Sequence, residues 1–459
     1  MYQINHMYIR YFMWNFVGRQ SDKQGTVDGK DGNWISGVPF LENPRAPKQT
    51  GLPKSMKNHP YRNTFYFIPF LLGLLGMVFH FMNDKKSFLI LLMLFLMTGV
   101  VLIIYGNSPP IEPRERDYIF AASFWAFCIW MGAGVVALFS LFNFLKGPAR
   151  AGLAVGVALI APLLMGFQGW DEHDRSDRYA ARDYAINYLE SCAPNAILFT
   201  QGDNDTYPLW YAQEVEGVRK DVHVVNLSLL GVDWYINQKR HKVNDAAAVP
   251  MIQQPEDIRG SERDMVLYNE SPSIAPQDRY VNLVQIMEFI ADETNQRRSQ
   301  GGDQISYYPT KKFSLPIPSA EQLVANGTVD PEDQALITPQ MNWTLPKDRL
   351  LKNDLMVLDI IAANAKNGWT RPIYFAVSVD RNSYMGLNDY FQLEGLAYRL
   401  VPIKNNEADR SAPFIGRVNT DKMYDNLMNK FKFGNIDKDG VFMSTDVGRM
   451  ASNFRSNFV

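Results

Sequence analysis

Cysteine is scarce in this chain, and its scarcity excludes one class of protein. The 459 residues include two cysteines, Cys128 within an apolar run and Cys192 far along the chain. Two such separated thiols cannot form a disulfide framework, so a small disulfide-stapled domain is excluded. The N-terminus also lacks a charged region followed by a compact apolar stretch and a small-residue cleavage site. No signal peptide is therefore recognisable.

An excess of charge of one sign is lacking as well. Lys and Arg number 46 against 48 Asp and Glu, which gives a formal net charge of −2. Such a balance provides no basic surface for nucleic acid, which we exclude as a partner. His6, His59, His223 and His241 show no metal-ligand spacing. The sequence also has no Ser-His-Asp signature, Walker loop or Gly-x-Gly-x-x-Gly motif.

What the sequence does contain is a set of long apolar runs in its first third. Four runs follow one another, at 66–82, 87–105, 118–144 and 151–167. Runs 87–105 and 118–144 carry no charged side chain and exceed the roughly 18 apolar residues that predict a membrane-spanning helix. The runs at 66–82 and 151–167 are shorter, but flanking aromatic residues could extend them. We therefore predict a membrane α-helical bundle of about four spans over residues 65–168.

The connections between these runs predict an orientation. Segments 83–86 and 145–150 carry net positive charge, whereas two Arg in 106–117 are balanced by acidic residues. The positive-inside rule places the two positive connections in the cytoplasm. Everything after the fourth run then lies outside, which in a bacterium is the periplasm. The expected localisation is a multi-pass protein of the bacterial inner membrane with a periplasmic C-terminal domain.

The two flanking regions have a different composition. Residues 1–17 are dense in Tyr, Phe, Met and Trp but too short to span, which favours an interfacial helix or the frayed end of a longer span. Residues 18–63 are rich in Gly, Pro, Asn, Lys and Asp and predict a long loop. We therefore assign 1–64 as an interfacial helix with an extracytoplasmic loop.

Residues 169–459 predict a soluble α/β domain with a largely parallel sheet, because helical patterns alternate with short apolar strands. Strands are expected at 196–200, 222–229, 372–379 and 396–403, and helices at 179–191, 207–216, 232–240, 354–365 and 421–431. Segment 244–346 is polar and proline-rich with weak signals, which indicates an irregular insertion.

Asp203 and Asp205 are the sharpest chemical signal in this domain, because they directly follow a predicted strand. An Asp-x-Asp pair in that place can hold a divalent cation through hard carboxylate oxygens. The alternative, which we favour, is that Asn204 or Asp205 caps the next helix while Gly202 supplies the turn. We expect no cofactor, and a divalent cation here is the less favoured reading.

His173 lies in an acidic cluster that includes Asp171, immediately after the fourth apolar run. Such a cluster could bind a metal or act in acid–base chemistry. A solvated helix terminus, in which acidic residues meet the helix dipole, is the more frequent reason for such a run.

Arg114 and Arg116 lie in a proline-stiffened loop, together with Glu112, between two predicted spans. Planar guanidinium groups at a membrane face suit bidentate capture of a lipid phosphate. Local pairing with Glu112, Glu115 and Asp117 explains the same residues equally well.

Three runs give the sequence a resemblance to a known family. They are YFMWNFVGRQ at 11–20, PPIEPRERD at 109–117 and GDNDTYPLWYAQ at 202–213, and the agreement extends through 170–189. They resemble a bacterial domain-of-unknown-function family of multi-pass membrane proteins related to the protein O-mannosyltransferases of the GT-C superfamily. The resemblance implies sugar transfer from a polyprenyl-phosphate carrier to an extracytoplasmic acceptor such as a protein. It also implies that the catalytic acidic residue belongs to an N-terminal membrane half that we do not find here, so no catalytic residue is carried over.

Three functions follow as hypotheses. The first is the C-terminal half of a GT-C-like glycosyltransferase, in which the soluble domain supports substrate or acceptor binding in a lipid bilayer. The second is a non-catalytic, membrane-anchored periplasmic module for partner binding or assembly. The third is a metal-dependent transferase that uses Asp203 and Asp205.

Overall fold

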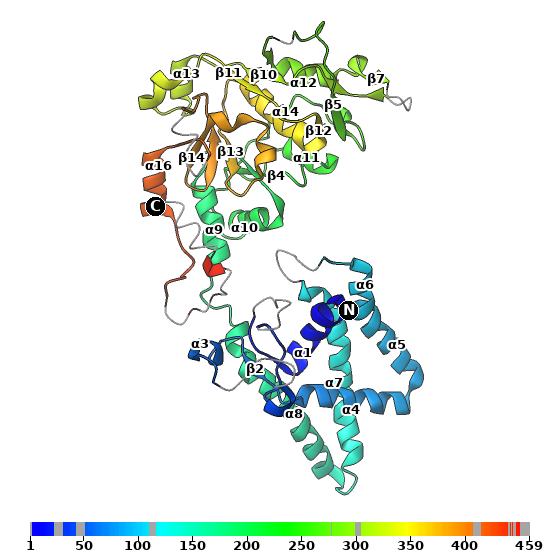
Figure 1. Cartoon of the computed structure of the whole chain (residues 1–459). Helices are drawn as coiled ribbons and strands as arrows, with labels where there is room; N and C mark the ends of the chain where they lie inside the picture. The colour runs from blue at the N-terminus through cyan, green and yellow to red at the C-terminus, as the bar shows by residue number, and fades with distance from the viewer. Residues whose placement is uncertain are drawn as a thin grey trace. The chain divides into compact units, whose positions relative to one another are not determined.

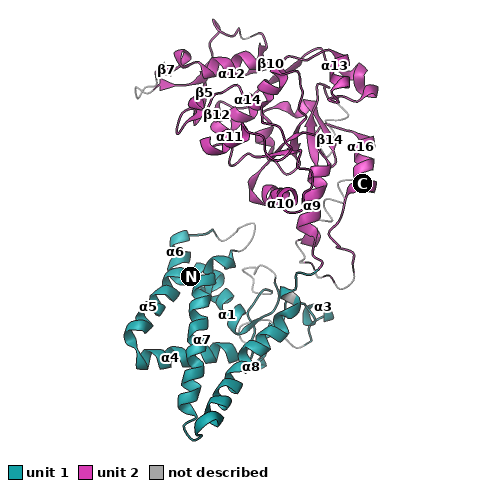
Figure 2. Cartoon of the chain, turned by 180° about the vertical axis from the view of Figure 1, so that it is seen from behind, with its two compact units in different colours: residues 1–176 teal, residues 177–459 magenta. Residues whose placement is uncertain are grey.

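The computed structural model describes residues 2–22, 31–42, 51–109, 116–276, 278–298, 304–406, 415–438, 441, 443 and 447–449. The chain divides after Ser176 into two compact units, Met1–Ser176 and Asp177–Val459 (Figure 2). Each unit has a hydrophobic core of its own.

Unit 1 is a helical bundle with two very short strands. Its elements are η1 Gln3–Ile9, α1 Arg10–Phe16, β1 Gly18–Arg19, α2 Pro39–Glu42, α3 Lys54–Lys57, β2 Asn63–Thr64, α4 Ile68–Asn83, α5 Lys85–Leu96, η2 Met97–Val101, α6 Leu102–Gly106, η3 Asp117–Phe120, α7 Ala121–Leu141 and α8 Gly147–His173. Local signals set several of these bounds. The Asp84 carboxylate accepts hydrogen bonds from the backbone N–H groups of Lys86 and Ser87, so it caps α5. Asn107 ends α6 in the left-handed conformation.

Three helical stretches of unit 1 are long and apolar enough to cross a membrane. They are Lys85–Gly106, Asp117–Leu141 and Gly147–Asp171, and they correspond to three of the four predicted runs. The remaining run forms α4, whose 16 residues extend about 24 Å, less than the roughly 30 Å of a hydrocarbon core. The described residues of unit 1 thus contain three candidate spans, and a span at α4 remains a prediction.

Glycine allows α4 and α7 to cross at close range (Figure 2). A side chain at Gly76 would overlap the backbone carbonyl oxygen of Trp130, and one at Gly73 would overlap the Phe127 ring. Gly134 of α7 in turn lies against the carbonyl of Leu72. Backbone approach at small residues is the packing mode of helices in lipid, where apolar burial gives no preference for helix over lipid.

The N-terminal segment belongs to this bundle. Tyr8, Phe12 and Phe16 recur every four residues, so they lie on one helical face, and all three are buried. The rings of Phe12 and Phe16 lie 4.9 and 4.6 Å from the Phe127 ring of α7. The segment is therefore packed by its aromatic face against the other helices, and its interfacial position stays a prediction.

Unit 2 alternates helices with short strands. Its elements are α9 Ala180–Glu190, β3 Ile197–Thr200, α10 Gly202–Glu214, β4 His223–Asn226, α11 Asp233–Lys239, η4 Glu256–Ile258, β5 Met265–Tyr268, β6 Val281–Asn282, α12 Leu283–Ala291, η5 Glu293–Asn295, β7 Arg297–Arg298, β8 Gln304–Ile305, β9 Tyr307–Tyr308, β10 Lys312–Leu315, α13 Ala320–Ala325, η6 Pro331–Leu336, β11 Met341–Thr344, β12 Arg349–Leu351, α14 Lys352–Lys366, β13 Ile373–Ala376, η7 Arg381–Tyr384, η8 Leu387–Tyr390, β14 Phe391–Glu394, β15 Ala397–Leu400, β16 Arg417–Val418, α16 Thr420–Asp425 and η9 Asn426–Lys430. The central helix α14 is buried along nearly its whole length.

The main sheet of unit 2 is mixed. Its six strands have the order β16-β14-β15-β13-β3-β4. Strands β14, β13 and β4 of this sheet are labelled in Figure 1. Strands β13, β3 and β4 are parallel to one another, and β16 is parallel to β14. Strand β15, however, runs antiparallel to both β13 and β14. The turn at Gly395 is too short for a helical crossover, so β14 and β15 form a hairpin.

Segment 244–346 contains short strands that the sequence did not indicate. Two further sheets, β11-β10-β6 and β12-β5-β9, are each of three strands. The strands within this segment have two to four residues, which is too few for an alternating pattern to stand out. Their apolar side chains, such as Tyr308, Phe313 and Met341, join the core of the unit.

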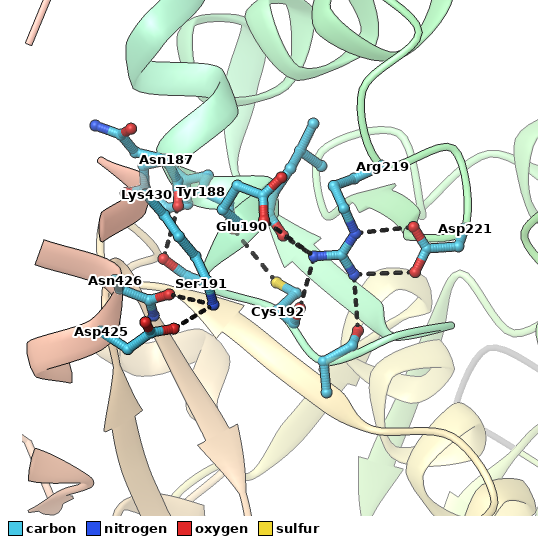
Figure 3. Close-up of polar contacts among 12 residues, drawn as sticks. Asn187, Tyr188, Glu190, Ser191, Cys192, Arg219, Asp221, Asp425, Asn426 and Lys430 are labelled. Atoms are coloured by element: carbon cyan, nitrogen blue, oxygen red, sulfur yellow. Dashed lines mark hydrogen bonds and ion pairs between the residues drawn. The ribbon is translucent and has the colours of Figure 1, made fainter. Parts of the chain in front are cut away.

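One arginine closes the C-terminal end of α9. Figure 3 shows the Arg219 guanidinium beside Asp221, which it contacts through two hydrogen bonds of 2.9 Å. The same group donates to the backbone carbonyls of Leu189, Cys192 and Ala193, at 2.9, 2.8 and 3.2 Å. These carbonyls lie at or just after the helix end, where the regular donor of a continuing helix is missing. Arg219 therefore joins the loop before β4 to the end of α9.

The hairpin β14–β15 carries a buried charged network. Glu394 and Arg399 are each 1% exposed, and their side chains lie 3.5 Å apart. The Glu394 carboxylate also accepts hydrogen bonds from Tyr374, Gln392 and Lys422, at 2.6, 2.8 and 3.1 Å. The buried carboxylate is thus compensated by several donors, which join β13 and α16 to the hairpin.

Candidate functional site

The parallel strands β13, β3 and β4 end at one edge of the main sheet, where polar residues gather. Gln201 to Asp205 follow β3, Ser378 and Asp380 follow β13, and Asn226 ends β4. In open α/β sheets the carboxyl ends of parallel strands are the usual place for ligands, because helix N-termini and loop side chains converge there. We name Gln201, Asp203, Asp205, Ser378, Asp380 and Tyr184 the carboxyl-edge cluster.

Asp205 is the centre of this cluster. It lies in the first turn of α10 and is half-buried. Its carboxylate accepts a hydrogen bond of 2.6 Å from the Ser378 hydroxyl and a longer one, 3.5 Å, from the Tyr184 hydroxyl. Burial raises the pKa of Asp205, and the hydrogen bond from Ser378 only partly opposes this effect. The carboxylate is therefore held in place yet remains partly open to solvent.

Two tyrosines of α9 contact the side chains of Asp205 and Ser378 in the cluster. The rings of Tyr184 and Tyr188 pack edge to face, with centroids 4.8 Å apart. The Tyr188 hydroxyl donates to Ser378 Oγ at 3.3 Å, while Ser378 donates to Asp205. Burial also raises the pKa of both tyrosines, so they remain neutral donors at physiological pH.

Two further contacts fix the loops of the cluster relative to each other. The backbone N–H of Asp380 donates to the Gln201 side-chain oxygen at 2.8 Å, which connects the loops after β13 and β3. The Asn226 amide donates to Thr206 Oγ1 at 2.9 Å, which connects the end of β4 to α10. The edge is thus built from three strands and does not depend on a single flexible loop.

Asp203 differs from Asp205 in its surroundings. Asp203 and Asp205 are two residues apart on α10, so their side chains point in different directions. The side chain of Asp203 is exposed. Within the described residues no group of three His, Cys, Asp or Glu side chains is close enough to hold a metal ion. The divalent-cation reading of Asp203 and Asp205 therefore gains no third ligand from that part of the chain.

The predicted capping role of Asn204 or Asp205 is wrong. Helix α10 begins at Gly202, so both residues lie within its first turn and not before it. Gln201 is the N-cap residue, and its side chain makes no capping hydrogen bond. Gly202 has φ +74°, a conformation that glycine adopts easily, so the helix starts directly after the strand. The sequence prediction began this helix later, at residue 207.

The remaining predicted site residues lie elsewhere, in unit 1. Glu112 and Arg114 fall outside the described residues, whereas Arg116 is exposed and directly precedes η3. His173 and Asp171 are exposed at the end of α8, where Nδ1 of His173 donates to the Gly169 carbonyl at 2.7 Å. The structure thus provides no metal cluster around His173 among the residues it describes.

Sequence reasoning did not single out Ser378, Asp380 or Tyr184. The available signal was that Ser378 and Asp380 end a predicted strand, as Asp203 and Asp205 follow another. Tyr184 had no such signal, because its role depends on how α9 packs against the sheet.

Fold and site together define a chain with candidate membrane-spanning helices and a mixed α/β unit that carries a polar strand-end site. The family described as TMEM260-associated domain 2 matches residues 181–422, more than half of the 459 residues. The chain belongs to this family, and the matched region includes the whole carboxyl-edge cluster. No curated protein matches the chain, and no solved structure does.

Proposed function

We propose that unit 2 binds a saccharide, or the sugar-bearing part of an acceptor, at the carboxyl-edge cluster, in support of glycosyl transfer of the GT-C type. The observation that carries this proposal is the chemistry of the edge. Its carboxylates and amide are hydrogen-bond acceptors suited to sugar hydroxyls, and Ser378 and Tyr184 hold the central carboxylate in place.

An aromatic surface next to these acceptors supports the same ligand class. Tyr207 lies one helical turn after Asp203, so both project from one side of α10. Tyr207 is 51% exposed, and its ring stacks on Trp210 at 5.5 Å. Aromatic faces pair with the C–H faces of sugar rings, while the carboxylates take the hydroxyls. The side chains of Asp203 and Tyr207 together present both features to solvent.

The wider proposal follows from the resemblance. The sugar carrier would be a polyprenyl phosphate, for which Arg114, Arg116 and Glu112 are the proposed headgroup residues. The protein would lie in a bacterial inner membrane with unit 2 in the periplasm and would act on an acceptor such as a protein. An alkaline-phosphatase fusion after Arg178 should then be active and a fusion after Lys146 inactive. The reverse pattern would contradict this orientation.

Saccharide binding is tested with the full chain in lipid nanodiscs on a glycan array, followed by titration calorimetry with the best ligand. Asp203→Asn and Tyr207→Ala should each weaken binding by about tenfold, the loss of one good hydrogen bond or stacking contact. Tyr424→Ala is a matched control, because Tyr424 is a 66% exposed tyrosine on α16 of the same unit. Absence of saccharide binding, or equal affinity in all variants, would favour the alternative of a non-catalytic binding or assembly module.

A further inference from the structure

Unit 1 contains a cavity that belongs to none of the sites above. Its volume is about 490 Å³, within the roughly 300–1,000 Å³ typical of ligand pockets. Its walls come from five parts of the unit: the end of α1, strands β1 and β2, the start of η3 and the last turns of α8. The polar residues that line it are Asn15, Arg19, Asn63, Asp117 and His173, and Trp14, Phe65, Met165 and Trp170 supply the apolar surface.

The cavity lies at one end of two candidate spans, which places it at a membrane–water interface. The span Asp117–Leu141 begins at Asp117, and the span Gly147–Asp171 ends one residue after Trp170. Exposed aromatic rings mark the same level: Trp170 is 72% exposed and Phe167 is 89% exposed. Tryptophan at this depth is typical of the headgroup region of a bilayer.

One side of the lining suits an anion. The Arg19 guanidinium lies 5.7 Å from the Trp14 ring centre and 4.8 Å from that of Tyr61, so its plane is held by aromatic stacking. Trp14 is 7% exposed, and its indole N–H finds no hydrogen-bond acceptor in the described part of the chain. A guanidinium beside an unused indole donor is a suitable pair for a phosphate.

The other polar groups suit a cation that can donate hydrogen bonds. Asp117 is exposed and makes no ion pair with any described residue. Nδ1 of His173 donates to the Gly169 carbonyl, and in the tautomer with its proton on Nδ1 the other nitrogen, Nε2, is an acceptor. Asn15 donates through Nδ2 to the Tyr11 carbonyl at 2.8 Å, which leaves its side-chain oxygen as an acceptor as well.

We propose that this cavity binds the headgroup of a phospholipid that carries phosphoethanolamine, with the phosphate against Arg19 and Trp14 and the primary ammonium group against Asp117. The lining carries one full positive and one full negative charge, so a zwitterion is matched at both ends. A purely anionic headgroup would leave Asp117 opposed to the ligand's charge. A trimethylammonium group would leave the acceptors of Asn15 and His173 without a donor. Met165 and Trp170 add apolar surface beside these polar groups.

The test uses the delipidated full chain in a mild detergent, titrated by native mass spectrometry with dioleoyl phosphatidylethanolamine, phosphatidylglycerol and phosphatidylcholine. Phosphatidylethanolamine should bind about tenfold more tightly than the other two, which corresponds to one charge-assisted hydrogen bond. Asp117→Asn should remove this preference without weakening phosphatidylglycerol, and Asp117→Glu should keep it. Asp171→Asn changes an exposed acid at the end of the span Gly147–Asp171 that is not in the cavity lining, so it should leave the preference unchanged.

Trp14→Phe separates ligand binding from structure. It keeps an aromatic ring and removes a donor with no acceptor among the described residues, so it should weaken phosphatidylethanolamine binding without lowering the lipid-free melting temperature. Equal affinity for the three lipids, or a preference that survives Asp117→Asn, would overturn the proposal. If soluble O-phosphoethanolamine binds with this variant pattern and the lipid does not, the lipid assignment is wrong.

Discussion

The two units of this chain place their large apolar side chains in opposite ways, outward in unit 1 and inward in unit 2. In unit 1 large apolar side chains point outward, as Phe167 does with 89% of its surface exposed, and close contacts are made by glycine. In unit 2 the apolar residues are inside, with Leu358 of α14 fully buried, and charged groups such as Glu394 are buried with them. The difference follows from the surrounding solvent: lipid does not drive apolar groups inward, whereas water does.

The largest expected effect concerns the glycine contact that holds unit 1 together. Gly76→Ala places a methyl group on the carbonyl oxygen of Trp130 and should destabilise the bundle by about 1–3 kcal/mol or more. Hydrogen exchange of α4 and α7 peptides in nanodiscs should rise, with β3 and β13 unchanged. Gly132→Ala is the control, since a Cβ there meets nothing within 4 Å. If both variants behave alike, unit 1 is not held by backbone approach.

The second prediction concerns Arg219, which joins the loop before β4 to the end of α9 in unit 2. Arg219→Ala removes the pair with Asp221 and the side-chain donor to three carbonyls at the end of α9, of which the Leu189 carbonyl keeps a backbone hydrogen bond. Roughly 2 kcal/mol or more of unit 2 stability should be lost, a typical cost for partly buried charged hydrogen bonds. Chemical denaturation followed by exchange in β3 and β4 measures it. The neighbouring Lys220→Ala should be nearly silent, and a similar loss there would mean that the loop itself is fragile.

The third prediction tests a buried carboxylate of unit 2. Asp359 is fully buried and accepts hydrogen bonds from the backbone N–H groups of Ile252 and Gln253, and burial raises its pKa to about 7. The folded state therefore binds a proton that the unfolded state, with a pKa near 3.9, releases earlier. Stability should fall by a few kcal/mol as pH rises from about 4 to about 7, and Asp359→Asn should flatten that slope.

The fourth prediction has the opposite sign. His223 of β4 is buried, and burial lowers its pKa to about 4, so it is neutral in the fold. The unfolded state takes up a proton near pH 6.5, so stability is lost as pH falls from about 6.5 to about 4. His223→Gln should reduce this acid sensitivity, while the slope that belongs to Asp359 remains. A variant with unchanged acid sensitivity would show that His223 is not its source.

The smallest expected effect should be equal in both units. Asp84 caps α5 in unit 1, and Ser319 forms a capping box with Gln322 at α13 in unit 2. Both caps lie at helix ends that we place in water, so Asp84→Ala and Ser319→Ala should each cost about 0.5–2 kcal/mol. A far larger cost at Asp84, measured by exchange in α5, would mean that this helix end is surrounded by lipid.

The sequence predicted the positions of helices and strands better than it predicted how the strands pair and in which direction they run. Strands β3 and β13 and helix α14 were placed within a few residues, because a continuous apolar run or a helical period is a local signal. The strand expected at 396–403 is present as β15, but its antiparallel direction was not predicted, since strand direction depends on the short turn at Gly395 and on which neighbour the strand pairs with. The cluster was half predicted: Asp203 and Asp205 carry a local pattern, whereas Ser378 and Tyr184 do not.

By itself the sequence determined where apolar length suffices for a span, which segments alternate between helix and strand, and where charged loops interrupt them. The tertiary structure alone decided that Asp205, Ser378 and Tyr184 meet, although up to 194 positions separate them. It also decided that Trp14, Arg19, Asp117 and His173 line one cavity. A local pattern shows which face of a segment is apolar and which is polar. Contacts between distant segments depend on how whole helices and strands pack, which a period of two or 3.6 residues does not encode.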